Sequence, residues 1–214
     1  MILLIDTMLV LLLLTIFVLL GSSRLGTCIR ISALQGVVVG LLPLAESGTD
    51  LSLRVAIMGT AIVVLKGVVF PYLLFRALRE SNTSREVQPF VGYAASLCVG
   101  VLSILASFWL DARLMLPVDA ISGLLVPVAF AMMMTGLFLI VARKTAVTQV
   151  IGYLVLENGI YTFGSAIVGD IPALVELGVL MDVFVAVFVM GIAIYHINRE
   201  FDHIDSDRLN TLKG

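Results

Sequence analysis

Charged residues are scarce in this chain. Only 13% of its 214 residues are Asp, Glu, Lys or Arg, whereas 60% are hydrophobic, and the mean hydropathy is +1.13. A soluble domain has about a quarter charged residues, so this composition excludes a water-soluble globule and predicts a polytopic membrane protein in contact with lipid. The small net charge of −2 and the lack of a basic surface interleaved with aromatic residues argue against a nucleic-acid partner.

Cysteine and histidine are also rare. Cys28 and Cys98 have no CxxC partner and no neighbouring histidine, which argues against a structural disulfide or a metal site. His196 and His203 lie at or beyond the end of the last apolar segment, and their spacing does not indicate metal binding. No nucleophile triad, phosphate-binding loop or haem ligand pair is recognisable. We therefore expect no catalytic residues and no cofactor in this chain.

Long apolar runs are what the sequence does have. A membrane-spanning helix needs about 20 residues, and seven segments qualify: 2–20, 28–45, 54–78, 90–110, 120–142, 147–168 and 172–196. The first has no basic region before it and no clear cleavage site, so we expect a retained helix rather than a signal peptide. The sequence thus predicts an all-α protein with about seven transmembrane helices. We divide it into a four-helix region (1–119), a three-helix region (120–196) and a polar tail (197–214).

The second segment is the weakest of the seven, because it contains Arg30, Gln35 and Pro43. It also contains Gly36 and Gly40, a GxxxG spacing that lets another helix approach closely.

The distribution of basic residues predicts the orientation in the membrane. With seven spans, Arg54 and Arg113 lie on one side of the membrane. The other side receives ten basic residues, which are Arg24, Arg30, Arg76, Arg79, Arg85, Arg143, Lys144, Arg199, Arg208 and Lys213. The positive-inside rule then predicts an outside N-terminus and a cytoplasmic C-terminus.

Two acids lie deep in the last two predicted helices. Glu157 is 13 residues before Asp170, in the predicted outer turn, and Asp182 is 12 residues after it. Both are therefore roughly 18–20 Å from that turn, where an ionisable group is costly and commonly functional. They are candidates for proton transfer, because an apolar environment favours the neutral acid, which can then release a proton. The alternative is a purely structural role, in which each acid stays neutral, is hydrogen-bonded to a neighbour and only fixes helix packing.

Lys66 is the third candidate. It lies in the middle of its segment, too deep for easy snorkelling, so we expect it to pair with a buried acid beside a kink at Pro71. Glu176 is a fourth, weaker candidate near the outer rim. Asp6 reads as an interfacial residue, and Gln35 as a polar contact between helices.

Three motifs resemble the hydrogenase-4 component E family, the small membrane subunits of formate-hydrogenlyase-type and related energy-converting hydrogenase complexes. They are Ile151-Gly-Tyr-Leu-Val-Leu-Glu-Asn-Gly159, Glu176-Leu-Gly-Val-Leu-Met-Asp182 with the apolar run after it, and Leu209-Asn-Thr-Leu-Lys-Gly214. This resemblance spans essentially the whole chain.

The last three predicted helices are also similar, more loosely, to the K subunit of respiratory complex I and to the C subunit of Mrp antiporters. The K subunit has a Gly-Leu-Glu step with an Asn four residues after its Glu. Here Asn158 is matched, but Leu154 occupies the place of the acid, and Glu157 comes three residues later.

The resemblance implies a membrane subunit of a complex I-related assembly in a prokaryotic inner membrane. Its partners would be antiporter-like subunits and a cytoplasmic redox arm, and iron–sulfur clusters and a nickel–iron site would belong to those partners. Two functions stay open: a share in proton or ion translocation coupled to that redox chemistry, or a scaffold that joins antiporter-like modules without a proton path.

Overall fold

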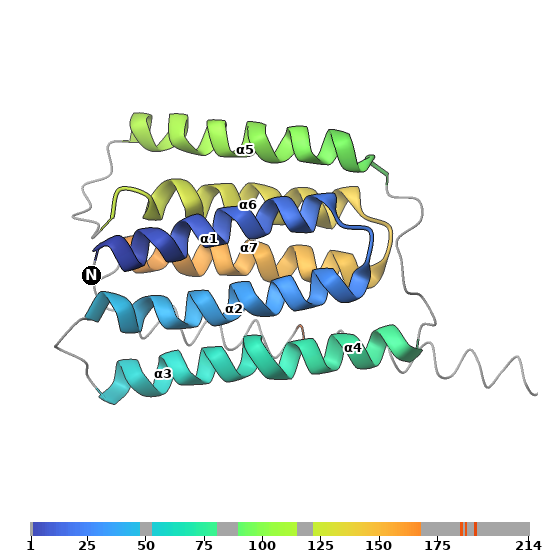
Figure 1. The fold of residues 1–214 in the computed structure, drawn as a ribbon, viewed down its shortest axis with the longest axis horizontal. Coiled ribbons are helices and arrows are strands. Elements are labelled where there is room, and N and C mark those ends of the chain that lie inside the picture. Colours follow the sequence, from blue (N-terminus) through green and yellow to red (C-terminus); the bar gives the residue numbers. More distant parts are fainter. Residues whose placement is uncertain are drawn as a thin grey trace, which may run out of the picture.

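The computed structural model describes residues 2–47, 53–80, 90–114 and 122–167, with isolated positions beyond them. Every element in these ranges is a helix, which confirms the all-α prediction there (Figure 1). The helices are α1 (Ile2–Gly21), α2 (Leu25–Ser47), α3 (Leu53–Val64), η1 (Leu65–Val69), α4 (Phe70–Glu80), α5 (Tyr93–Leu114), α6 (Leu125–Ala142) and α7 (Ala146–Ile167). The seventh predicted segment, 172–196, lies outside the described residues.

Five of these helical segments are long and apolar enough to cross a bilayer: α1, α2, the continuous α3–η1–α4, α5 and α6. The chain is therefore a multi-pass membrane protein. α7 has 22 residues, but Gln149, Glu157 and Asn158 make it less apolar than the five. In a bilayer core each backbone group must be bonded within its own segment, and this requirement explains why apolar runs form helices.

The helices lie side by side, roughly parallel or antiparallel to one another (Figure 1). α7 packs against α6, α2 and α4, and α5 packs on α1 and α6 at one edge of the bundle. The α3–α4 helix lies at the opposite edge, against α2. α7 is thus surrounded by the apolar helices and shares their depth.

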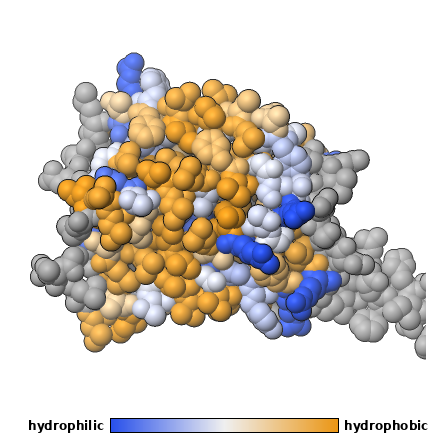
Figure 2. All heavy atoms as spheres, viewed as in Figure 1, coloured by the Kyte–Doolittle hydropathy of each residue, from blue (hydrophilic) through white to orange (hydrophobic). Residues whose placement is uncertain are grey.

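The core follows the helical period. The buried residues of α1 recur three or four positions apart, the spacing of one helix face; they include Ile5, Leu9, Leu12, Ile16 and Leu19. Large apolar side chains on the other faces remain exposed, among them Leu3, Leu14, Leu102 and Trp109. Figure 2 shows the apolar surface as a broad band, with hydrophilic residues gathered mainly toward one end. Such a band suits lipid or a membrane partner.

Glycines bring two helix pairs into close contact. A Cβ atom on Gly40 of α2 would lie 2.8 Å from Val63 Cγ2 of α3, so the predicted GxxxG contact is confirmed. Between α6 and α7 the contact is backbone to backbone: a Cβ on Gly152 would lie 2.8 Å from the Ile140 nitrogen, and one on Gly159 would lie 2.8 Å from the Ala129 oxygen. These positions tolerate only glycine without a shift of the neighbouring helix.

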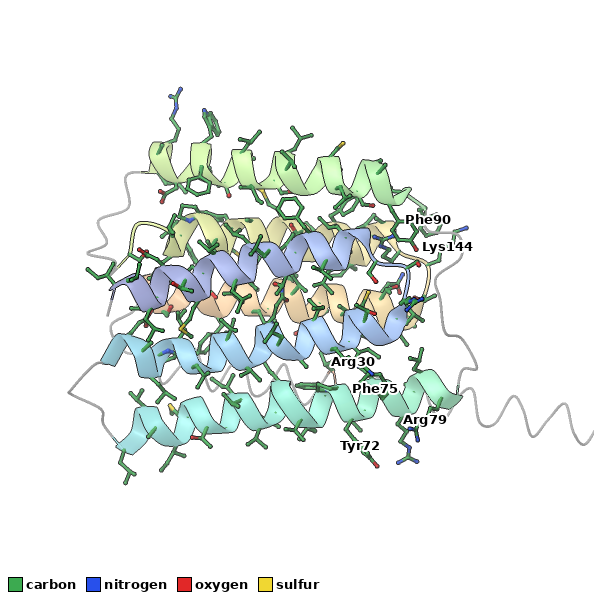
Figure 3. The ribbon with its side chains drawn as sticks, in the orientation of Figure 1. Arg30, Tyr72, Phe75, Arg79, Phe90 and Lys144 are labelled. Carbon is green, nitrogen blue, oxygen red and sulfur yellow. The ribbon has the colours of Figure 1, made fainter. Side chains whose placement is uncertain are left out.

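One end of the bundle is basic. Arg30, Arg79 and Lys144 lie toward the same end in Figure 3. The side chain of Arg143, at the turn between α6 and α7, is only 1% exposed. Its Nη2 atom donates to the Leu20 carbonyl at 2.7 Å, and its guanidinium lies 4.7 Å from the centre of the Tyr93 ring. A cation there complements the carbonyl end of α1 and links three helices.

Candidate functional site: a buried lysine–glutamate pair

Lys66 and Glu157 meet inside the bundle. The Lys66 Nζ atom lies 3.2 Å from Glu157 Oε1, and it donates a hydrogen bond to Asn158 Oδ1 at 3.0 Å. The three residues are 6%, 7% and 1% exposed, respectively. A cation at mid-helix is therefore held by two successive side chains of α7. The structure joins Lys66 to a buried acid, as we expected of a lysine at this depth.

The carboxylate of Glu157 has unused hydrogen-bonding capacity. Its contact with Lys66 is a charge contact without the alignment of a hydrogen bond, and neither oxygen accepts a hydrogen bond within the described part of the chain. An ionised carboxylate offers about four lone-pair sites. Buried polar atoms are normally paired with protein or ordered water, so this carboxylate can still accept a hydrogen bond from a further donor.

Lys66 lies in an irregular turn. Residues Leu65–Val69 form a π-helical turn, in which the Phe70 N–H donates to the carbonyl of Leu65, five residues back. The next residue is Pro71, which has no N–H to donate. We expected a kink at this proline, and the structure places a π turn before it. Turns of this kind are frequent at functional sites.

Gly36 makes room for the lysine. A Cβ atom on Gly36 would overlap the Cβ of Lys66 and approach the Lys66 backbone at 3.2 Å. One turn along α2, Gly40 makes the matching contact with Val63. The GxxxG pair therefore does more than allow two helices to pack, because it sets the Lys66 backbone close enough to α2 for its side chain to extend to α7.

The remaining candidates fall in different places. Asp182 and Glu176 lie outside the described residues, so their positions relative to Glu157 stay predictions. Asp6 accepts a hydrogen bond from Ser122 Oγ at 2.5 Å and so links the start of α1 to the residues before α6. Gln35 is fully buried and donates from Nε2 to Thr15 Oγ1 at 2.7 Å, which confirms it as a contact between helices.

Two polar residues of the bundle do not stand out in the sequence. Asn158 was noted only as part of a motif, although its position next to a buried acid is a signal for a shared partner. Glu46 falls just beyond the predicted segment 28–45, whereas α2 continues to Ser47. A longer helix would have placed this acid inside the bundle.

Comparisons with a family model and with individual proteins both give matches. Residues 124–214 match the family model of NADH-ubiquinone/plastoquinone oxidoreductase chain 4L. The chain is 32% identical over 190 residues to an uncharacterised protein of Mycobacterium tuberculosis. This match covers 88% of this chain and 86% of that protein.

A second relative has a descriptive name. The chain is 25% identical over 161 residues to hydrogenase-4 component E of Escherichia coli K12, with 75% of this chain and 74% of the relative covered. No solved structure matches the chain significantly. The length of these matches, together with the chain 4L match that contains Glu157 and Asn158, shows that the chain belongs to the hydrogenase-4 component E family.

Proposed function

We propose that this chain is a membrane subunit of a complex I-related, hydrogenase-type assembly, and that Lys66 and Glu157 take part in moving protons through it. The two family matches support the first part. One observation carries the second: a lysine and a glutamate 3.2 Å apart, both more than nine-tenths buried, with neither carboxylate oxygen accepting a hydrogen bond within the described residues.

The pair can exist in two charge states. With Glu157 ionised, its charge is balanced by Lys66, which offsets part of the cost of burying both groups. With Glu157 protonated, Lys66 keeps the Asn158 oxygen as an acceptor at 3.0 Å. The lysine therefore has a hydrogen-bond acceptor in both states, so the Asn158 amide partly stabilises its buried charge when the acid is protonated. That property suits a group that takes up and releases protons.

The proposal extends to the other acids, the spans and the orientation. Asp182 and Glu176 are further candidates for the same path. α7 and segment 172–196 are the sixth and seventh spans, and residues 1–119, 120–196 and 197–214 are the N-terminal region, the region similar to the K subunit, and the tail. The basic end of the bundle faces the cytoplasm.

Antiporter-like membrane subunits and a cytoplasmic redox arm are the proposed partners, in a prokaryotic inner membrane. The iron–sulfur clusters, and the nickel–iron site if there is one, lie in those partners. Electron transfer then takes place outside this chain, and the chain itself supplies only protonatable side chains.

The test is proton translocation in membrane vesicles that contain the assembled complex with Glu157→Gln. We expect electron transfer and subunit composition to be preserved, and the rate of proton translocation to fall on the order of a hundredfold, the lower end for losing a positioned proton-transfer group. Asp6→Asn is the matched control: it also converts a carboxylate to an amide, but at the hydrogen bond to Ser122, and should leave translocation unchanged.

Normal translocation in Glu157→Gln would overturn the proton role and favour the scaffold function. If this variant fails to assemble, Glu157→Asp decides, because it keeps an acid at the position. If Glu157→Asp assembles and its proton translocation is slowed, the result supports the proton path. If Glu157→Asp and a second neutral variant, Glu157→Met, both assemble and translocate protons at normal rates, the result supports the scaffold.

A further inference from the structure

One face of α7 carries polar groups on successive turns beyond Glu157. Tyr161 follows four residues later and Ser165 four after that, so the three side chains share a helix face that extends about 12 Å along the axis. The face leads from the buried pair toward the end of the bundle opposite the Arg143 turn. It therefore leads from mid-membrane toward one membrane surface.

A second acid lies at the far end of this face. Glu46, one residue before the end of α2, is partly buried and lies within hydrogen-bonding reach of Ser165 and within electrostatic range of Tyr161. Its Oε1 atom is fully buried and has no hydrogen-bond partner within the described residues. α2 thus contributes an acid to the polar face of α7.

Tyr161 lies between the two acids. Tyr161 is only 6% exposed, and its hydroxyl has no hydrogen-bond partner among the described residues. Buried tyrosine hydroxyls usually have one. Unpaired polar atoms therefore recur at Glu157, Tyr161 and Glu46, and a site with several polar atoms is where a buried water is stable.

The hydroxyl of Ser165 restricts the hydrogen bonding of Glu46. A serine has one proton to donate, and Ser165 donates it to the Thr162 carbonyl at 2.9 Å. A hydrogen bond between Ser165 and Glu46 in this arrangement requires the acid to be protonated and to donate. Rotation of the hydroxyl would instead serve the ionised acid, so both protonation states have a hydrogen bond available.

We propose that Glu46 and Tyr161 form the outward half of the proton route that begins at Glu157. Protons pass between Glu157 and Glu46 through water bound along the Tyr161 face, and Glu46 exchanges them with the membrane surface. This inference rests on the proposed function of Glu157. It assigns a proton-transfer role to an N-terminal helix that lies outside the region matched by the chain 4L family model.

The experiment measures proton translocation and electron transfer in vesicles with the assembled complex carrying Glu46→Gln, Glu46→Asp, Tyr161→Phe or Glu157→Gln. Asp111→Asn is the matched control, because Asp111 lies near the same end of the bundle but on α5, at the edge remote from α7. We expect Glu46→Gln to slow translocation at least about tenfold, with Glu46→Asp recovering most of the rate, and Tyr161→Phe to slow it less.

The two proposals fail separately. Defective Glu157→Gln together with normal Glu46→Gln and Tyr161→Phe would overturn the outward half and leave the proposed function intact. Normal Glu157→Gln would overturn both. If Glu46→Gln does not assemble, the ratio of protons moved per electron in Glu46→Asp and Tyr161→Phe decides: a lowered ratio supports the route, and an unchanged ratio in both overturns it.

Discussion

Lys66 is the residue on which the site depends, because it contacts two groups that respond differently to protons. Glu157 can change its charge, whereas the Asn158 amide cannot, and both lie within 3.2 Å of the ammonium. An ammonium has three N–H groups, so Lys66 can hold Asn158 and Glu157 while still binding water. The lysine thus balances the charge of the ionised acid and has a second partner in Asn158.

A double-mutant cycle separates the structural and functional parts of this contact. Lys66→Met removes the partner of Glu157, and breaking a buried ion pair costs about 3–5 kcal/mol when the remaining charge stays ionised. Proton uptake by Glu157 would limit that cost. We expect Lys66→Met to lower the thermal stability of the complex in detergent, and Lys66→Met with Glu157→Gln to recover much of it.

Proton translocation should remain defective in that double variant, because no acid remains at position 157. Subunit composition and the unfolding midpoint are measured on the same preparations. Recovery of translocation together with stability would contradict the proposed role, since it would mean that charge balance alone is required.

The sequence identified both members of the pair but not their contact. An ionisable residue in an apolar run is visible from its cost, which is why Lys66 and Glu157 could be selected. Their contact depends on the rotation of two helices, and the two residues are 91 positions apart along the chain (157 − 66 = 91). That rotation is set by Gly36, whose missing side chain leaves space for Lys66, and no periodicity in the sequence gives it.

At the scale of elements, the contact between α6 and α7 places the acid. Gly136, Gly152 and Gly159 remove the side chains that would separate the two backbones. In a membrane such close contact replaces the hydrophobic effect as the force that holds helices together. It also fixes the depth of α7, and therefore the position of Glu157 opposite Lys66.

Gly152→Ala should weaken this contact. The added Cβ would lie 2.8 Å from the Ile140 nitrogen and 2.9 Å from the Leu139 Cβ, and overpacking of this kind typically costs about 1–3 kcal/mol. Gly123→Ala is the control, because nothing lies within 4 Å of a Cβ there; it should change stability by no more than about 0.5 kcal/mol.

Thermal unfolding of the two variants in detergent measures the difference. Equal stability of Gly152→Ala and Gly123→Ala would show that α7 can move away from α6 at little cost. It would contradict the inference that the close contact between α6 and α7 positions Glu157.

Helix bounds were predicted within a few residues where polar residues end the apolar runs. Segment 28–45 is observed as Leu25–Ser47 and segment 54–78 as residues 53–80. Segment 120–142 begins later, at Leu125, because Ser122 accepts a hydrogen bond from the Leu124 N–H and donates to Asp6. Such a turn depends on a side chain from α1, which local sequence cannot reveal.

At the scale of the whole molecule, the distribution of charge predicts the orientation in the membrane. The basic residues at Arg30, Arg79 and Lys144 lie toward one end (Figure 3), and the apolar band of Figure 2 lies beside them. Positive residues are retained on the cytoplasmic side during insertion.

Labelling of single cysteines tests the orientation. In a chain with Cys28→Ser and Cys98→Ser, we expect Lys144→Cys to react with a membrane-impermeant maleimide only in inside-out vesicles. Gly123→Cys should react only in right-side-out vesicles, since both positions are exposed but lie at opposite ends of α6. The reverse pattern would contradict the proposed orientation, and the cysteine-free chain is the control.

The buried guanidinium of Arg143 also has a consequence for biosynthesis. Its partner, the Leu20 carbonyl, is 123 residues earlier in the chain, so the ribosome delivers α1 to the membrane long before the side chain that completes it. Until the α6–α7 hairpin is inserted, the end of α1 can be satisfied only by solvent or lipid headgroups at the membrane surface. The end of the first helix is therefore completed only after the α6–α7 hairpin has been inserted.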